Sequence, residues 1–108
     1  MGFIKRFLEK LVPVPRELAY VLAISKDKEL FMVSVQEEKK KQEYVYSVIY
    51  ETGKHGVKAE PQSRSVVISP EAFSTKENFK DAFYKLEGLK NFPLESFEDV
   101  WSQIGNKL

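Results

Sequence analysis

The residue of this chain best suited to acid–base chemistry is its single histidine, His55, which lies in the glycine-flanked segment Gly53–Gly56. A neutral imidazole can act as a general base or ligate a metal ion. One histidine cannot build a His-rich metal site, and no nucleophile or carboxylate stands at a spacing that pairs it with His55. We therefore interpret His55 as an exposed loop residue and expect no catalytic residues.

The lack of cysteine removes further kinds of chemistry. None of the 108 residues is a cysteine, which excludes disulfides, Cys-ligated zinc or iron–sulfur sites and a cysteine nucleophile. The acidic residues are spread along the chain, mostly beside a lysine, and no phosphate-binding glycine motif is present. We expect a non-enzymatic protein with no cofactor and no metal. The absence of cysteine also fits the reducing cytoplasm, which is the expected location.

Basic side chains form the next group with a chemical use, because they bind phosphates and other anions. The chain has 17 Lys and Arg residues against 16 Asp and Glu, so it lacks the basic excess typical of nucleic-acid binders. In a meander, however, the turn at 26–28 and the loop around His55 lie at the same end of the sheet. The residues gathered there would be Lys26, Lys28, Lys54, His55, Lys58 and Arg64. This end is a candidate anion or nucleic-acid contact, and a solvated loop end is the alternative interpretation.

A row of tyrosines is the most unusual feature of the expected sheet. Tyr44, Tyr46 and Tyr50 alternate along one strand and so share a face. Exposed rings on a sheet can stack on the bases of single-stranded nucleic acid. The same rings packed beneath a helix would form the floor of the core. The two interpretations differ in whether the rings are exposed.

Runs rich in Val, Ile, Tyr and Phe, bounded by polar clusters, predict the strands that position these residues. The expected strands cover 18–25, 29–36, 43–52 and 64–69, with a solvated charged loop at 37–42. The first strand is apolar on both faces, which is typical of a strand that is central in its sheet or covered on both sides.

An amphipathic helix is predicted before the strands, over residues 2–12, and Pro13 and Pro15 end it. Its apolar face consists of Phe3, Ile4, Phe7, Leu8 and Leu11. We consider three roles for this face: cover for the sheet or the C-terminal helices, contact with a partner or a second copy, and contact with a membrane surface. No apolar run in the sequence is long enough to span a bilayer.

Two helices are expected after the strands, over 75–87 and 97–106, preceded by a short turn at 70–73. Their start and stop signals are the capping-box pairs Ser74 with Glu77 and Ser96 with Asp99, and the glycine Gly88. The chain is thus expected to form a single α+β domain over 1–108. Its order is αββββαα, with an antiparallel meander of about four strands and the helices mainly on one face.

The function expected from these patterns is that of a small non-enzymatic binding or adaptor domain that engages a protein partner, with homodimerisation as one form. Two alternatives remain. The first is nucleic-acid binding through the tyrosine face and the basic loop end. The second is peripheral membrane association through the apolar face of the N-terminal helix, without a transmembrane segment.

Overall fold

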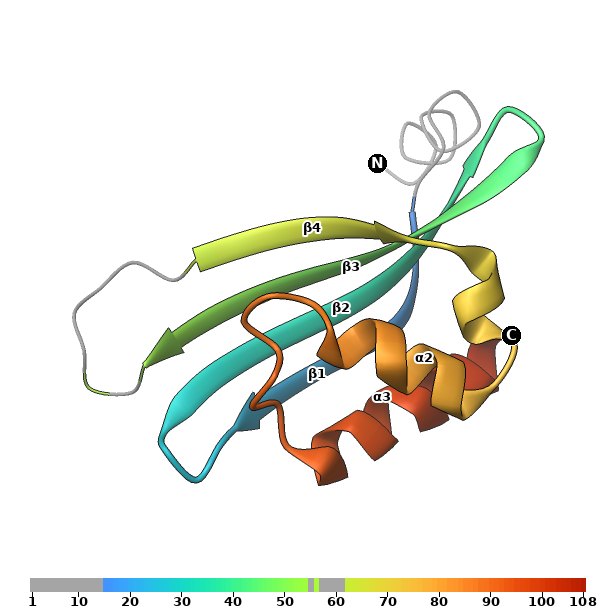
Figure 1. The fold of residues 1–108 in the computed structure, drawn as a ribbon. Helices are drawn as coiled ribbons and strands as arrows, with labels where there is room; N and C mark the ends of the chain where they lie inside the picture. Colours follow the sequence, from blue (N-terminus) through green and yellow to red (C-terminus); the bar gives the residue numbers. More distant parts are fainter. Residues whose placement is uncertain (1–14, 55, 57–61) are drawn as a thin grey trace, which may run out of the picture.

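A four-stranded antiparallel sheet forms the centre of the structure, a computed structural model that describes residues 15–54, 56 and 62–108 (Figure 1). The strands are β1 (Arg16–Ile24), β2 (Glu29–Lys40), β3 (Glu43–Lys54) and β4 (Gln62–Ile68). They are followed by the 3-10 turn η1 (Pro70–Phe73) and the helices α2 (Lys76–Tyr84) and α3 (Leu94–Lys107). The sheet and the two helices that follow it confirm the α+β class. The predicted N-terminal helix lies outside the described residues.

Neighbouring strands pair in sequence order, so the sheet is the predicted meander, β1-β2-β3-β4. All three pairings are antiparallel. Near the centre of the sheet, Val21 lies opposite Val33, and Val33 lies opposite Tyr50. Because directly opposite residues point to the same side of a sheet, these three side chains share a face.

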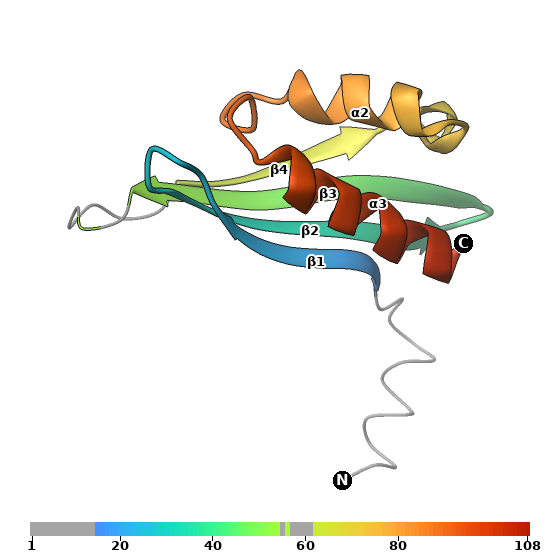
Figure 2. The ribbon, with the colours of Figure 1, turned by 90° about the horizontal axis from the view of Figure 1, so that it is seen from below.

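Both helices and η1 cover that same face, as the edge-on view in Figure 2 shows. The core lies between the helices and the sheet. Its largest fully buried side chains are Leu18, Val33, Val35, Val48, Tyr50, Phe79, Phe83, Leu89, Phe97, Val100 and Ile104. Phe79 contacts four aromatic rings of η1, α2 and α3 at centroid distances of 5.1–5.9 Å, namely those of Phe73, Phe83, Phe97 and Trp101. Aromatic side chains thus supply much of the apolar area that fixes the helices to the sheet.

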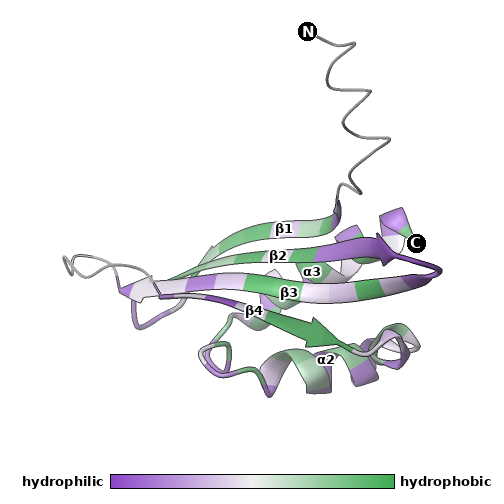
Figure 3. Cartoon of the chain, turned by 90° about the horizontal axis from the view of Figure 1, so that it is seen from above, coloured by the Kyte–Doolittle hydropathy of each residue, from purple (hydrophilic) through white to green (hydrophobic). Residues whose placement is uncertain are grey.

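The β2–β3 hairpin is longer than the sequence patterns indicate. We expected a loop over 37–42, but β2 continues to Lys40 and pairs with β3 up to Glu43, which leaves Lys41 and Gln42 as the turn. Lys41 has a φ of 56°, the left-handed conformation that a tight turn requires. The hairpin extends beyond the helices and is hydrophilic at its tip (Figures 1 and 3). A projecting arm is solvated on both faces, so charged residues can form strands there without an apolar pattern.

The start of α2 differs slightly from its predicted capping box. Thr75 is the N-cap residue, and its hydroxyl accepts a hydrogen bond from the backbone N–H of Asn78 at 3.0 Å. Ser74 instead accepts a hydrogen bond from the side-chain amide of Asn78 at 2.8 Å. The helix ends at Tyr84, before the predicted Glu87, and Gly88 follows with a φ of 94°.

The start of α3 was predicted wrongly. The helix begins at Leu94 after Pro93, two residues before the Ser96 that was expected to cap it, and it has no side-chain cap. The Pro93 carbonyl accepts the N–H of Phe97 at 3.0 Å and so closes the first turn. Pro93 is extended, with a φ of −60° and a ψ of 136°, and the fixed φ of proline fits this position directly before a helix.

The position of β1 also corrects an expectation. The first strand was expected to be central or covered on both faces, yet β1 is an edge strand with one covered face. Ala19 and Val21 are buried beneath the helical layer, whereas Leu22 and Ile24 are exposed on the other side. A bulge between Glu17 and Ala19 places Leu18 in the core as well. Apolar residues on both faces of β1 therefore leave one apolar surface open.

Candidate protein-binding face

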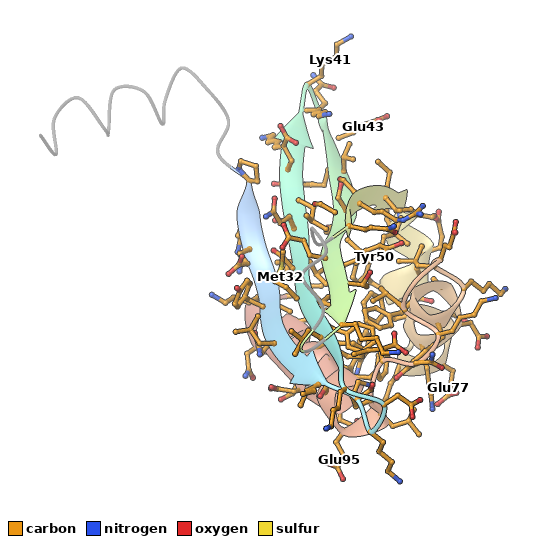
Figure 4. The ribbon with its side chains drawn as sticks, turned by 90° about the vertical axis from the view of Figure 1, so that its left-hand side faces the viewer. Met32, Lys41, Glu43, Tyr50, Glu77 and Glu95 are labelled. Atoms are coloured by element: carbon orange, nitrogen blue, oxygen red, sulfur yellow. The ribbon has the colours of Figure 1, made fainter. Side chains whose placement is uncertain are left out.

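The side of the sheet opposite the helices carries no described element, and we call it the open sheet face (Figure 2). Strand alternation and the register place these residues on it: Tyr20, Leu22, Ile24, Leu30, Met32, Ser34, Gln36, Val45, Ser47, Ile49, Glu51, Gly53, Ser65 and Val67. Figure 4 shows Met32 and Tyr50 on opposite sides of the sheet, with Tyr50 turned toward the helices. A sheet of this kind normally has a polar solvent face, so its apolar residues are informative.

Those apolar residues concentrate on β1 and β2. The apolar patch consists of Tyr20, Leu22, Ile24, Leu30, Met32 and Ile49. Leu22 is 68% exposed and Ile24 is 55% exposed, although both belong to regular strands. Isolated exposed leucines are common on protein surfaces, but a contiguous apolar patch on one face of a sheet indicates a contact surface.

A shallow hollow lies at one end of the apolar patch. Gly53 of β3 is opposite Leu30 of β2, and its lack of a side chain leaves open space beside Leu30. The hollow has a volume of about 320 Å³ and is lined by Leu22, Leu30, Met32, Glu51 and Gly53, among others. It is therefore an apolar depression with one carboxylate at its border, a shape that accepts an inserted apolar side chain.

A polar cluster bounds the other end of the patch. Ser34 is only 4% exposed, and its hydroxyl donates to Glu17 Oε2 at 3.0 Å. Gln36 Nε2 donates to the same Ser34 oxygen at 3.2 Å. These bonds hold the Glu17 carboxylate over the sheet. Glu17 and Glu51 thus stand at two sides of the patch, while Lys26 and Lys28 lie in the turn beyond Ile24 and Leu30.

The tyrosine row of β3 lies on the opposite, helix-covered face. Tyr50 is 1% exposed, and its hydroxyl donates to the carbonyl oxygen of Glu87. The Tyr46 hydroxyl donates to Glu37 Oε2 at 2.9 Å, and its ring contacts Phe73. Of the three, Tyr44 alone is widely exposed, near the tip of the hairpin arm and opposite Lys39. A stacking platform would need several exposed rings, but Tyr50 is part of the core and Tyr46 packs against it.

Burial also changes the acidity of these phenols. Loss of solvent raises the pKa of Tyr50 above its ordinary value of 10.0, and the Arg64 charge opposes this in part. Loss of solvent also raises the pKa of Tyr46, and the hydrogen bond to the Glu37 carboxylate adds to the rise. Both groups therefore stay neutral at physiological pH, as donors in fixed hydrogen bonds.

Part of the predicted basic loop end is brought together by the fold. The register places Lys54 opposite Glu29, so the end of β3 lies beside the β1–β2 turn that holds Lys26 and Lys28. Arg64 is directed elsewhere, because its guanidinium pairs with Glu87 Oε2 at 3.4 Å. His55 and Lys58 lie outside the described residues. Glu29 also accepts a hydrogen bond from Asn91 at 3.1 Å, so carboxylate and amide groups are mixed with the lysines here.

The remaining predicted site residues are those of the N-terminal helix face. Phe3, Ile4, Phe7, Leu8 and Leu11 lie outside the described residues. Residues of the open sheet face were not singled out from the sequence. The signal that could have found them is the apolar character of both faces of β1.

The other surfaces of the described residues were compared by their polar clusters and depressions. No group of three or more His, Cys, Asp or Glu side chains that could hold a metal ion occurs within residues 15–54, 56 and 62–108. An open depression of about 780 Å³ beside α2 is lined by both acidic and basic side chains, such as Lys80, Asp81 and Lys85. In the same part of the chain, no helix has the length and apolarity needed to cross a membrane.

Comparison of the chain with protein-family models, with curated proteins and with solved structures found no match. The open sheet face therefore stands as the candidate site on its own physical properties.

Proposed function

We propose that this protein is a small non-enzymatic binding domain that engages a protein partner through the open sheet face. The observation that carries this proposal is the apolar patch, whose exposed residues include Leu22 and Ile24. Burying such side chains in an interface gains about 25 cal/mol per Å² of apolar surface removed from water.

The face has the composition of a protein interface. An apolar centre with a hollow beside Gly53 is bordered by polar and charged residues such as Ser34 and Glu51. Interfaces of stable complexes combine an apolar core with a polar rim in this way. The tyrosine face offers less to a nucleic acid, because Tyr50 is in the core.

A patch variant with a matched control tests the proposal. Leu22→Asp combined with Leu30→Asp adds two charges to the patch, and Leu94→Asp adds one at a residue with similar exposure on the helix side (61%). Tagged proteins are purified from their source cells under identical conditions, and the co-purifying proteins are compared by mass spectrometry. We expect at least one protein to be retained by the wild type and by Leu94→Asp and lost from the patch variant.

Sedimentation velocity on the same proteins separates the forms of this proposal. Self-association that the patch variant abolishes identifies a second copy as the partner. A monomer whose co-purifying proteins are the same with and without the patch substitutions contradicts the proposal.

A further inference from the structure

The open sheet face has charge properties that select among its conceivable occupants. The charged residues that border the apolar patch within the sheet are Glu17 and Glu51, both carboxylates, and the lysines of the turn lie beyond one end of the patch. A second copy stacked face to face would place carboxylates near carboxylates, and an anionic membrane would meet the same repulsion. The face is better matched to an apolar segment that carries basic residues.

The chain itself contains such a segment. Residues 1–14 place five apolar residues at helical spacing, and the residues between them include Lys5, Arg6 and Lys10 against a single carboxylate, Glu9. An apolar stripe with net positive charge is complementary to an apolar patch with carboxylates at its border.

The length and the attachment point of this segment suit the face. The segment joins β1 at Arg16, and the patch residues of β1 begin four positions later at Tyr20 and end at Ile24. At about 3.3 Å per residue, the patch lies roughly 13–26 Å from the start of the strand. A helix over residues 2–12 would be about 16 Å long, and residues 13–15 add about 10 Å in extended form. After a reversal beside Arg16, the segment would therefore reach the far end of the patch, roughly 26 Å away.

We propose that residues 1–14 dock on the open sheet face of their own chain and compete there with the partner. This inference rests on the proposed function, because it concerns the regulation of the same surface. A tethered occupant acts at an effective concentration in the millimolar range, so it lowers the apparent affinity of any partner for the patch. Removal of the segment from the face would then activate binding.

Thiol reactivity in the full-length chain tests the docking directly. The chain has no cysteine, so Leu22→Cys introduces a single thiol into the patch. Its reaction rate with a maleimide is compared with that in a chain that also carries Phe7→Asp and Leu8→Asp. We expect the thiol to react at least about tenfold more slowly when the segment is intact. The matched control is Leu94→Cys on the helix side, whose rate should not respond to the same two substitutions.

The charge argument has a separate test. Glu51→Lys in the Leu22→Cys chain replaces a complementary charge with a repulsive one. It should lower the protection several-fold, where protection is the ratio of the thiol rates with and without Phe7→Asp and Leu8→Asp, because this ratio cancels the direct effect of the new lysine on the reactivity of the thiol. Glu95→Lys, at an exposed residue of α3, should leave this protection unchanged.

Three outcomes overturn the inference. Rates that are equal with and without the segment substitutions, and as fast as that of the exposed Leu94→Cys thiol, show that the face is free. The partner experiment on the patch variant tests the proposed function independently of this result. Protection that increases with protein concentration shows that a second copy covers the face. Protection that survives Phe7→Asp and Leu8→Asp shows that the segment is not the occupant.

Discussion

The side-chain amide of Gln103 in α3 forms two hydrogen bonds with the backbone of Tyr20 in β1. The Tyr20 N–H donates to Gln103 Oε1 at 2.9 Å, and Gln103 Nε2 donates to the Tyr20 carbonyl at 3.2 Å. These are the backbone groups that β1 presents at the outer edge of the sheet, where another strand could pair. An exposed edge strand is prone to pairing with other chains, and one side chain here satisfies part of that edge.

Gln103→Ala should therefore weaken both the fold and the protection of the edge. We expect a loss of about 1–2 kcal/mol in the free energy of unfolding, since each hydrogen bond contributes about 0.5–1.5 kcal/mol net. Urea denaturation measures this loss, and light scattering should show greater self-association at high concentration. Ser102→Ala, at an exposed neighbouring residue of α3, is the control and should change neither quantity. A Gln103→Ala protein as stable as the wild type would contradict a role for the amide in holding β1.

Replacing Gly88 or Gly105 with alanine should change the stability of the protein in opposite directions. Gly88 has a φ of 94°, and a Cβ there would meet Tyr50 Cε2 at 3.5 Å, an ordinary contact distance. The cost of Gly88→Ala thus comes mainly from the backbone, and we expect a loss of about 1–2 kcal/mol. Gly105 lies inside α3 with no atom within 4 Å of an added Cβ. Gly105→Ala should therefore stabilise the protein by about 0.5–1 kcal/mol in thermal or urea unfolding. Equal changes in stability at the two positions would contradict the different backbone roles of Gly88 and Gly105.

The turn of the long hairpin offers a stabilising substitution. Lys41 has a φ of 56°, a conformation that costs a residue with a Cβ about 1–2 kcal/mol. Lys41→Gly removes this strain, but glycine also has a greater conformational entropy in the unfolded chain, which opposes the gain. The net effect should be a rise of up to about 1 kcal/mol in the free energy of unfolding. Lys40→Gly, one residue earlier in β2, should lower it by about 0.5–1 kcal/mol. A loss of stability in both variants would mean that the turn does not constrain the hairpin.

Stability should fall at alkaline pH because of the buried phenols. The pKa of Tyr50 is raised above 10.0 in the folded state, mainly by loss of solvent. Between the unfolded and the folded pKa the native state binds more protons than the unfolded state, so the free energy of unfolding decreases as the pH rises above about 10. Below pH 10 this contribution is fully present.

Tyr50→Phe isolates that contribution. The variant loses the hydrogen bond to the Glu87 carbonyl, so it should be about 1 kcal/mol less stable at pH 7. It should also lose less stability than the wild type between pH 9 and pH 11, measured by urea denaturation at each pH. Tyr44→Phe, which removes a hydroxyl from an exposed ring, should keep the wild-type slope. Identical slopes for wild type and Tyr50→Phe would show that this phenol does not control the alkaline limit.

Most of the sheet could be predicted from local sequence patterns, because strand signals act over a few residues. Alternation along β3 and the apolar run of β4 indicate strands regardless of what packs on them, and the short break at 26–28 sets the first turn. The ends of elements were less predictable. The charged residues of 37–42 resemble a loop, yet they form the end of the long hairpin, and Pro93 replaces Ser96 at the start of α3.

By itself, the sequence determined the α+β class, the meander order and the absence of cysteine chemistry, because these follow from residue types and their spacing. The tertiary structure decided which faces are covered. Val21 and Leu22 are adjacent apolar residues of β1, and the local sequence does not indicate which of them is buried. The helices bury Val21 and leave Leu22 exposed. The same choice buried Tyr50 and opened the face that carries the proposed site. That choice depends on where α2 and α3 pack across the sheet, a non-local property that alternation along one strand cannot encode.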